Sequence, residues 1–271
     1  MPLCQCNFYA KTLGFCVNIS VYIPGPRRSH YANMSLDEIY SPVKKYKTLY
    51  LLHGMYEDDS TWLRKSNIER YAEEKQIAVV MPSVQNSYYA DMKYGPDYFT
   101  YLTEELPRLV CNLFPLSDKR EDTFIAGLSM GGYGACKAAF ARPERYGAFA
   151  SLSGAVDIEG ILQYIEHIEM SEEATEAKKL FTAVFGSLAE YKNSTADLFY
   201  QSEQLKDSGK SLPRAYIACG MDDKLCYPMN RKLTAHLSAL GIPVTYEEGP
   251  GDHNWDFWDV YIKKVLDWLV A

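Results

Sequence analysis

Short apolar runs alternate with longer amphipathic segments over most of the chain. The runs have the length and near-continuous apolar character of buried strands, and they fall at 47–53, 77–82, 123–127, 148–153, 214–219 and 244–247. Between them, apolar residues recur at helical spacing near 66–75, 97–114, 131–142, 228–240 and 256–269. Apolar strands separated by helices predict a mostly parallel sheet with helices on both faces.

Two segments depart from this alternation. At the N-terminus, strands near 7–13 and 15–23, joined at Gly14, predict an antiparallel hairpin at an edge of the sheet, and 24–45 follows as a surface loop. Residues 157–212 contain Glu-rich helical pieces and no obvious strand, so we interpret them as a cap-like insertion over the carboxyl edge of the sheet, where such sheets bind ligands. No repeat or linker divides the chain, and 1–271 is expected to form a single domain with this insertion.

The charge balance argues against a polyanionic partner. The chain has 28 Lys and Arg against 35 Asp and Glu, a net charge of −7, and its basic residues are scattered, so we expect no nucleic-acid binding. The N-terminal residues lack the pattern of a secretory signal, and no apolar run reaches the roughly 18 residues that a membrane span needs. These features predict a cytoplasmic protein without membrane contact, and they are compatible with a homo-oligomer.

The cysteines support the same compartment. Seven is an odd number, the spacing has no disulfide framework, and Cys16, Cys136 and Cys219 fall in apolar strand or helix context. Buried, reduced thiols are typical of cytoplasmic proteins. Cys4 and Cys6 could form half of a metal site, but no second pair of Cys or His lies nearby, so we expect no metal.

The segment around Ser129 carries the most specific chemical signal. Gly127-Leu-Ser-Met-Gly131 follows an apolar strand and precedes an alanine-rich helix, which is the context of a nucleophile elbow. A serine in so tight a turn needs a strained backbone, and glycine two residues before and two after it avoids clashes. The turn exposes the hydroxyl, and the start of the helix favours the negative charge that develops in acyl transfer.

A serine nucleophile needs a base, and in chains with this elbow the base follows the serine. Three histidines do so. His167 lies in the insertion, where a surface position is the default, and His236 lies among leucines of an amphipathic helix. His253 lies in a loop between the last strand and the last helix, so we assign it as the base.

The acidic partner of the base is expected in the turn after the strand at 214–219. This turn, Gly220-Met-Asp-Asp-Lys, offers Asp222 and Asp223. Adjacent residues cannot both face one imidazole, so the aspartate that does not face it is expected to cap the turn or the next helix. The turn by itself leaves the choice open.

Acyl transfer also needs two backbone N–H groups that stabilise the oxyanion. Met130, the residue after the nucleophile, is expected to supply one, and Met55, in the turn after the strand at 47–53, the other. His53 shapes this turn, and we do not assign it as a base.

Taken together, these motifs resemble one family. They are Leu51-Leu-His-Gly-Met, Gly127-Leu-Ser-Met-Gly-Gly-Tyr-Gly, Cys219-Gly-Met-Asp-Asp-Lys-Leu and Gly251-Asp-His-Asn-Trp-Asp-Phe-Trp, in order over nearly the whole chain. The set resembles the esterase D / S-formylglutathione hydrolase-like group of α/β hydrolases, and it is most similar to the bacterial tributyrin (acyl) esterases, which also carry a segment like Gln85-Asn-Ser-Tyr-Tyr-Ala-Asp. The resemblance implies the α/β-hydrolase fold.

The resemblance also decides between the two aspartates. In the family the second acidic residue of the turn belongs to the catalytic triad, which implies Asp223 here. The family usually has glycine before the histidine, whereas this chain has Asp252, which adds negative charge beside His253.

What the resemblance implies is hydrolysis of short acyl esters through an acyl-enzyme, without metal or organic cofactor. We expect Gly54, Tyr89 and Trp255 to contact the small-molecule ester. S-formylglutathione, or acetyl and feruloyl esters of plant saccharides, are alternative substrates, the latter because Tyr88, Tyr89, Tyr94 and Trp255 offer stacking surface. An acyl acceptor other than water stays open, and a noncatalytic binding module is disfavoured because every part of the triad is present.

Overall fold

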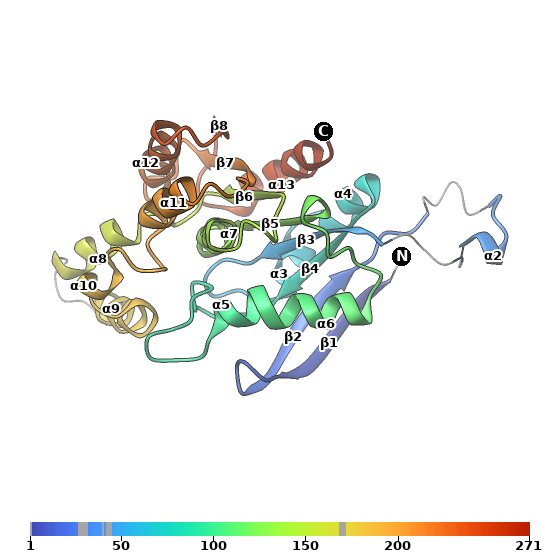
Figure 1. Ribbon diagram of the computed structural model, residues 1–271, viewed down its shortest axis with the longest axis horizontal. Coiled ribbons are helices and arrows are strands. Elements are labelled where there is room, and N and C mark those ends of the chain that lie inside the picture. The colour runs from blue at the N-terminus through green and yellow to red at the C-terminus, as the bar shows by residue number, and fades with distance from the viewer. Residues whose placement is uncertain (1, 27–31, 40, 42–44, 168–171) are drawn as a thin grey trace.

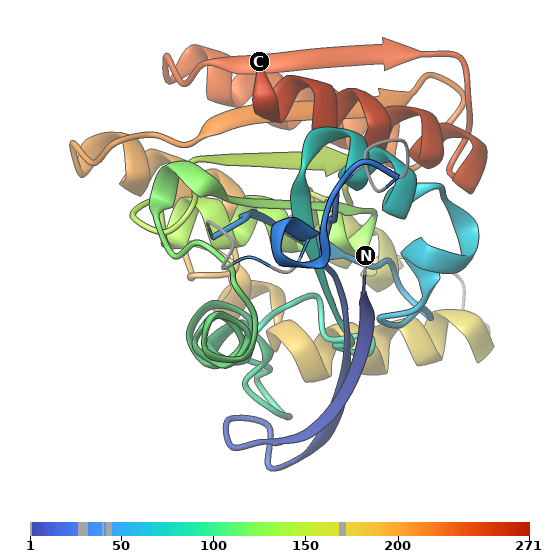
Figure 2. The same ribbon diagram turned by 90° about the vertical axis from the view of Figure 1, so that its right-hand side faces the viewer.

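The computed structural model describes residues 2–26, 32–39, 41, 45–167 and 172–271. Its centre is a sheet of eight strands in the order β1-β2-β4-β3-β5-β6-β7-β8 (Figures 1 and 2). Strand β2 pairs antiparallel with β1 and with β4, and the remaining neighbours are parallel. The strands are β1 Leu3–Ala10, β2 Phe15–Tyr22, β3 Lys47–Leu52, β4 Ile77–Pro82, β5 Thr123–Leu128, β6 Ala148–Leu152, β7 Arg214–Gly220 and β8 Val244–Gly249.

Helices cover both faces of the sheet, and each face has its own cluster of buried side chains. Helices α3, α4 and α13 pack on one face around residues such as Trp62, Tyr71 and Trp258. Helices α6, α7 and α12 pack on the other. Because of this cover, β4, β5 and β6 are buried at every position, which explains their apolar sequences. The bounds are α3 Thr61–Lys65, α4 Ile68–Lys75, α6 Leu106–Leu113, α7 Met130–Ala141, α12 Cys226–Ala239 and α13 Trp255–Val270.

The N-terminal hairpin forms the expected sheet edge, but with different bounds. Strand β1 covers Leu3–Ala10 instead of 7–13, because residues 11–14 form the turn. The Gly14 N–H closes this turn by donating to the Ala10 carbonyl at 2.9 Å, and Gly14 has a φ of 80°, which favours glycine. Figure 2 shows the hairpin projecting from the lower edge of the molecule.

The sequence pattern missed several short elements. Helix α2 (Leu36–Ile39) lies inside the expected surface loop, and the 3₁₀ turn η2 (Arg120–Asp122) precedes β5. The helix expected over 97–114 consists of α5 (Tyr98–Thr100), the π-helical turn η1 (Tyr101–Glu105) and α6. Pro107, in the first turn of α6, has no N–H to continue a regular hydrogen-bond ladder at this junction. Helix α3 was also not predicted.

Between β6 and β7 the chain forms a group of helices. They are α8 Ile158–His167, α9 Glu172–Phe185, α10 Leu188–Tyr191 and α11 Leu198–Asp207. In Figure 1, α8, α9 and α10 lie together at the left end of the molecule, opposite α2. Apolar side chains of α8 and α9, including Leu162, Phe181 and Val184, are buried against the core of the α7 face. Among the described helices, none has both the length and the apolar character of a membrane span.

Lys137 is a charged residue in the buried part of α7. Its side chain is 3% exposed, and its ammonium lies 4.5 Å from the centroid of the Phe99 ring. Burial lowers the pKa of Lys137 to about 8, although the charge of Asp91 acts in the opposite direction. A lysine in the unfolded chain keeps its ordinary pKa of ~10.5, so the folded state is penalised below about pH 8, and the penalty fades as the pH rises between these values.

We predict that Lys137→Met, which keeps a long apolar side chain without the charge, raises Tm near neutral pH. The expected gain in the free energy of unfolding is on the order of 2 kcal/mol, and it should shrink as the pH approaches ~10. Thermal unfolding of both proteins at neutral and alkaline pH measures this, with Lys65→Met on the exposed side of α3 as control. An equal loss of Tm at both pH values would mean that the contact with Phe99 outweighs the cost of burial.

Candidate active site

Ser129 occupies the turn between β5 and α7 in a strained conformation. Its φ is 52° and its ψ is −118°, which is rare for a residue other than glycine. The surrounding backbone leaves no room for side chains at the flanking glycines. A Cβ at Gly127 would lie 2.5 Å from the backbone of Gly131, and one at Gly131 would lie 2.5 Å from the Leu52 carbonyl oxygen. The tight packing therefore requires both glycines, and the Ser129 side chain faces a cavity.

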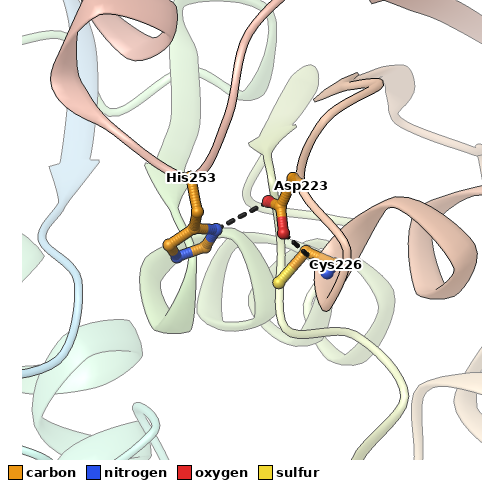
Figure 3. Close-up of side chains that lie close together, drawn as sticks. All are labelled: Asp223, Cys226 and His253. Carbon is orange, nitrogen blue, oxygen red and sulfur yellow. Dashed lines mark hydrogen bonds and ion pairs between the residues drawn. The ribbon is translucent and has the colours of Figure 1, made fainter.

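Three side chains from separate loops form one hydrogen-bonded chain. Ser129 Oγ lies 3.0 Å from His253 Nε2, and His253 Nδ1 lies 2.7 Å from Asp223 Oδ2. Figure 3 shows the second of these contacts. Ser129 follows β5, Asp223 follows β7, and His253 lies between β8 and α13, so the carboxyl ends of parallel strands bring them together. With Nδ1–H donating to the carboxylate, Nε2 is free to accept the serine proton.

The two adjacent aspartates face different partners. The side chain of Asp223 is 1% exposed, and its Oδ1 accepts a hydrogen bond of 2.8 Å from the Cys226 N–H. Burial alone would raise the pKa of Asp223, but the hydrogen bonds from His253 and Cys226 outweigh burial and lower it. Asp222 is exposed, and its Oδ2 accepts from the Gly251 N–H at 3.1 Å. Asp223 is thus held as an anion beside the imidazole, while Asp222 ties its turn to the histidine loop.

The expected oxyanion donors both lie beside Ser129. Met130 is the first residue of α7, and the first four N–H groups of a helix have no partner within the helix. Met55 lies in the turn after β3 and lines the same cavity as Ser129. This turn packs directly against the start of α7, because Gly131 touches the carbonyl oxygens of Leu52 and His53.

His53 fixes the shape of the turn after β3. Its ring is buried, with Nδ1 donating to the Gly54 carbonyl at 2.7 Å and Nε2 accepting from the Val84 N–H at 3.1 Å. Burial lowers the pKa of His53 to about 4, so the ring is neutral at neutral pH. Both nitrogens are occupied by backbone, which leaves His53 no proton-transfer role. Since the Gly54 carbonyl and the Met55 N–H belong to one planar peptide, fixing the first also directs the second.

The cavity above Ser129 has a volume of about 610 Å³. Helices α8 and α9 contribute one wall, made of Gly160, Ile161, Tyr164, Ile165, Ala177 and Phe181. The opposite walls include Gly54, Tyr88, Leu225, Met229 and Trp258. Among the described residues that line it, none is Lys or Arg, and Glu57 is the one carboxylate. The space therefore suits a small, uncharged and largely apolar ligand.

The structure corrects two of the expected substrate contacts. Tyr89 is fully buried, and its hydroxyl donates to the His53 carbonyl at 3.0 Å, so it supports the turn instead of facing the cavity. Trp255 lies outside the cavity wall, with its ring in T-shaped contact with Trp62 and Trp258. Tyr94 is 67% exposed and also lies outside this cavity.

The other two histidines that follow Ser129 are not part of this group. His236 lies on α12, where its Nε2 is 3.2 Å from Ser202 Oγ and 3.3 Å from the Phe199 carbonyl oxygen on α11. The side chain of His167 lies outside the described residues.

Sequence reasoning missed Glu57 and Trp258. Glu57 lines the cavity two residues after Met55, and burial raises its pKa, although hydrogen bonds from Gly54 and Trp255 act against this. Trp258 stands edge-on to the His253 ring, with centroids 4.9 Å apart and an interplanar angle of 90°. Its position three residues into the last helix was the only available signal, because helical spacing turns this side chain back toward the loop that carries His253.

Asp223, Cys226 and His253 also place three potential metal ligands within 4.8 Å of one another (Figure 3). The group does not suit a metal ion. Asp223 and His253 are joined directly by a hydrogen bond of 2.7 Å. Burial raises the pKa of Cys226 well above its ordinary value, which disfavours the thiolate that a metal would need.

Comparison with known proteins agrees with this geometry. The family model Esterase matches residues 27–269. An acetyl esterase of Caldicellulosiruptor saccharolyticus is 34% identical over 270 residues, which cover 99% of this chain and 98% of that protein.

Two solved structures from Staphylococcus aureus are similar over the whole chain. The substrate-bound fluorophosphonate-binding serine hydrolase FphF is 34% identical, with a TM-score of 0.85 and coverage of 100% of this chain and 98% of that one. The S-formylglutathione hydrolase FrmB, as apoenzyme, is also 34% identical, with a TM-score of 0.82 and coverage of 100% and 99%. The chain belongs to the Esterase family, and it is a serine carboxylesterase with the α/β-hydrolase fold.

Proposed function

We propose that the chain hydrolyses short-chain acyl esters through an acyl-enzyme formed on Ser129. The observation that carries this proposal is the continuous hydrogen-bonded chain from Ser129 through His253 to Asp223 at the floor of a mostly apolar cavity. As Oγ attacks the ester carbonyl carbon, His253 Nε2 takes the hydroxyl proton, and Asp223 stabilises the resulting imidazolium. The backbone N–H groups of Met55 and Met130 stabilise the negative oxygen of the tetrahedral intermediate.

The second half of the cycle returns every group to its starting state. When the tetrahedral intermediate collapses, the alcohol leaves with the proton from His253, and the acyl group stays on Ser129. Water then attacks the acyl carbon and gives its proton to His253. The Ser129 oxygen leaves as the carboxylic acid forms and recovers that proton, so water is the only further reactant.

The cavity favours a neutral ester over a glutathione thioester. S-formylglutathione carries carboxylates, which would meet Glu57 and none of the lysine or arginine side chains that usually bind such groups. The similarity to an acetyl esterase is consistent with a short acyl group. A feruloyl ester remains the second candidate, because Tyr88, Tyr164 and Phe181 give the cavity an aromatic wall.

We further propose that residues 1–271 act as one domain, with α8 to α11 as a cap over the cavity. A cytoplasmic location is supported by the seven cysteines, all of which are free thiols in the structure.

Loss of the nucleophile is the first test. Because proton abstraction and covalent attack act on one oxygen, Ser129→Ala should lower kcat by about a thousandfold or more. His253→Ala should be about as severe, and the double variant scarcely worse than either. Hydrolysis of p-nitrophenyl butyrate measures the rates. A fluorophosphonate should label the parent once, at Ser129; an active Ser129→Ala variant or a label elsewhere would contradict the assignment.

The adjacent aspartates provide a matched pair. Asp223→Asn removes the buried anion beside the imidazole and should reduce kcat by on the order of a thousandfold or more, as loss of a triad carboxylate does elsewhere. Asp222→Asn keeps an oxygen that can accept from the Gly251 N–H and removes only an exposed charge, so it should cost about tenfold or less. Steady-state kinetics of both variants decide this, and a reversed order of severity would assign the role to Asp222.

Substrate length tests the cap. Each buried methylene contributes about 0.8 kcal/mol while space remains, so kcat/KM should rise from acetyl toward butyryl and fall once the chain meets the cavity wall. Phe181→Ala removes part of this wall and enlarges the cavity, so it should shift the maximum of kcat/KM to longer acyl chains. Tyr94→Ala, at a residue outside the cavity, should leave the maximum unchanged. Soluble C2 to C12 esters measure the profile, alongside S-formylglutathione and a feruloyl ester. A parent maximum at C8 or beyond would refute a short-chain cavity.

A further inference from the structure

Glu57 forms hydrogen bonds to two parts of the site that lie far apart in the sequence. Its Oε2 accepts a hydrogen bond of 2.8 Å from the Gly54 N–H, in the turn that carries Met55. Its Oε1 accepts one of 3.1 Å from the indole N–H of Trp255, the first residue of the helix behind His253. We infer that Glu57 is a positioning residue that holds the turn carrying Met55, here called the oxyanion turn, against the loop that carries His253. This inference rests on the proposed role of the Met55 N–H as an oxyanion donor.

On the oxyanion side, Glu57 completes the fixation of one short turn. His53 holds the carbonyl oxygen of Gly54, and Glu57 holds its N–H, so both backbone groups of this glycine are engaged. The turn is also confined by contact, because a Cβ at Gly54 would lie 2.6 Å from Leu128 Cδ1 and 3.1 Å from Glu57 Oε2. With both peptide planes of Gly54 held, the direction of the Met55 N–H is set before substrate arrives. Such preorganisation is what makes an oxyanion donor effective.

On the histidine side, the clamp acts through aromatic rings in T-shaped contact. The Trp255 ring stands at 88° to Trp258, with centroids 5.3 Å apart, and Trp258 in turn stands at 90° to His253 at 4.9 Å. Trp62 closes the other side of Trp255 at 4.9 Å. Trp62 is itself anchored, because its indole N–H donates to the Leu52 carbonyl at 3.0 Å, at the end of β3. The indole of Trp255 therefore has one fixed orientation, with its N–H aimed at Glu57.

The carboxylate form is well matched to this position, because its two oxygens accept hydrogen bonds from two separate donors. A glutamine of the same shape has one acceptor oxygen, and its NH₂ group would face an N–H donor. The charge itself gives the oxyanion no help, since a carboxylate near a developing negative oxygen repels it. The value of Glu57 must therefore come from geometry, and this separates the inference from a direct electrostatic role.

The test compares Glu57→Gln with Trp255→Phe, which removes the indole N–H together with part of the ring system and keeps one aromatic ring between Trp62 and Trp258. Asp256→Asn, at an exposed position next to Trp255, is the matched control. The probes are a p-nitrophenyl butyrate assay, a short-chain trifluoromethyl ketone and the corresponding methyl ketone. Serine adds to the trifluoromethyl ketone carbonyl and leaves a negative oxygen in the oxyanion site, whereas the methyl ketone binds without this adduct.

We expect each of the two variants to lower kcat about tenfold with KM changed less than about twofold. Affinity for the trifluoromethyl ketone should fall by a similar factor, affinity for the methyl ketone should hold, and the double variant should resemble the single ones because both break one contact. Thermal midpoints within a few degrees of the parent exclude unfolding, and if Glu57→Gln fails to fold, Trp255→Phe alone carries the test.

Unchanged kcat and unchanged trifluoromethyl ketone affinity in a folded Glu57→Gln or Trp255→Phe protein would overturn the clamp. So would equal losses for both ketones, which would indicate a distorted cavity instead. Failure of the proposed function is distinguishable, because it would appear as activity or fluorophosphonate labelling that does not depend on Ser129.

Discussion

The close contact between the start of helix α7 and the turn after β3 is the constraint on which the rest of the site depends. Gly131 has no room for a side chain because the carbonyl oxygens of Leu52 and His53 lie against it. This contact sets the distance between the nucleophile turn and the oxyanion turn. Ser129 has a positive φ because β5 must pass into α7 within a few residues while this contact is kept. The strain at Ser129 is therefore balanced by the packing of buried strands and helices around it.

Differences in burial and in hydrogen-bond partners give His53 and His253 different roles. His53 is enclosed, and both of its ring nitrogens are hydrogen bonded to backbone groups. Burial lowers its pKa to about 4, so the neutral ring stabilises the turn after β3. His253 has a side chain that is 31% exposed, with a carboxylate on one nitrogen and a serine hydroxyl near the other. The residue type alone thus says little about chemistry. The chemical role of a histidine depends on whether its ring faces an anion and a proton donor or only fixed peptide groups.

Most of the strand pattern and the Ser129 motif could be predicted from sequence, because both are local. Five of the six parallel strands are near-continuous apolar runs, whereas β8 contains a threonine and two glutamates, and the elbow needs glycine at fixed positions. The direction in which neighbouring side chains point was not predictable. Tyr88 and Tyr89 both have a positive φ, yet Tyr88 lines the cavity and Tyr89 is buried under the oxyanion turn. The choice of Asp223 over Asp222 likewise needed either a family resemblance or the three-dimensional contact with His253.

Glu57 could not be found from sequence for a related reason. Its two partners are the backbone of Gly54, three residues away, and the side chain of Trp255, 198 residues away. Only the folded sheet, which brings the ends of β3 and β8 to the same edge, makes one carboxylate meet both. The cavity wall from α8 and α9 comes from a different part of the chain, between β6 and β7, and the described side chains of these helices make no hydrogen bond to Ser129, His253 or Gly54; Phe181 and Phe185 touch the framework through the ring of Tyr88. We therefore expect substitutions in α8 and α9 to alter mainly which acyl group fits, and substitutions at Glu57 or Gly131 to lower turnover whatever the substrate.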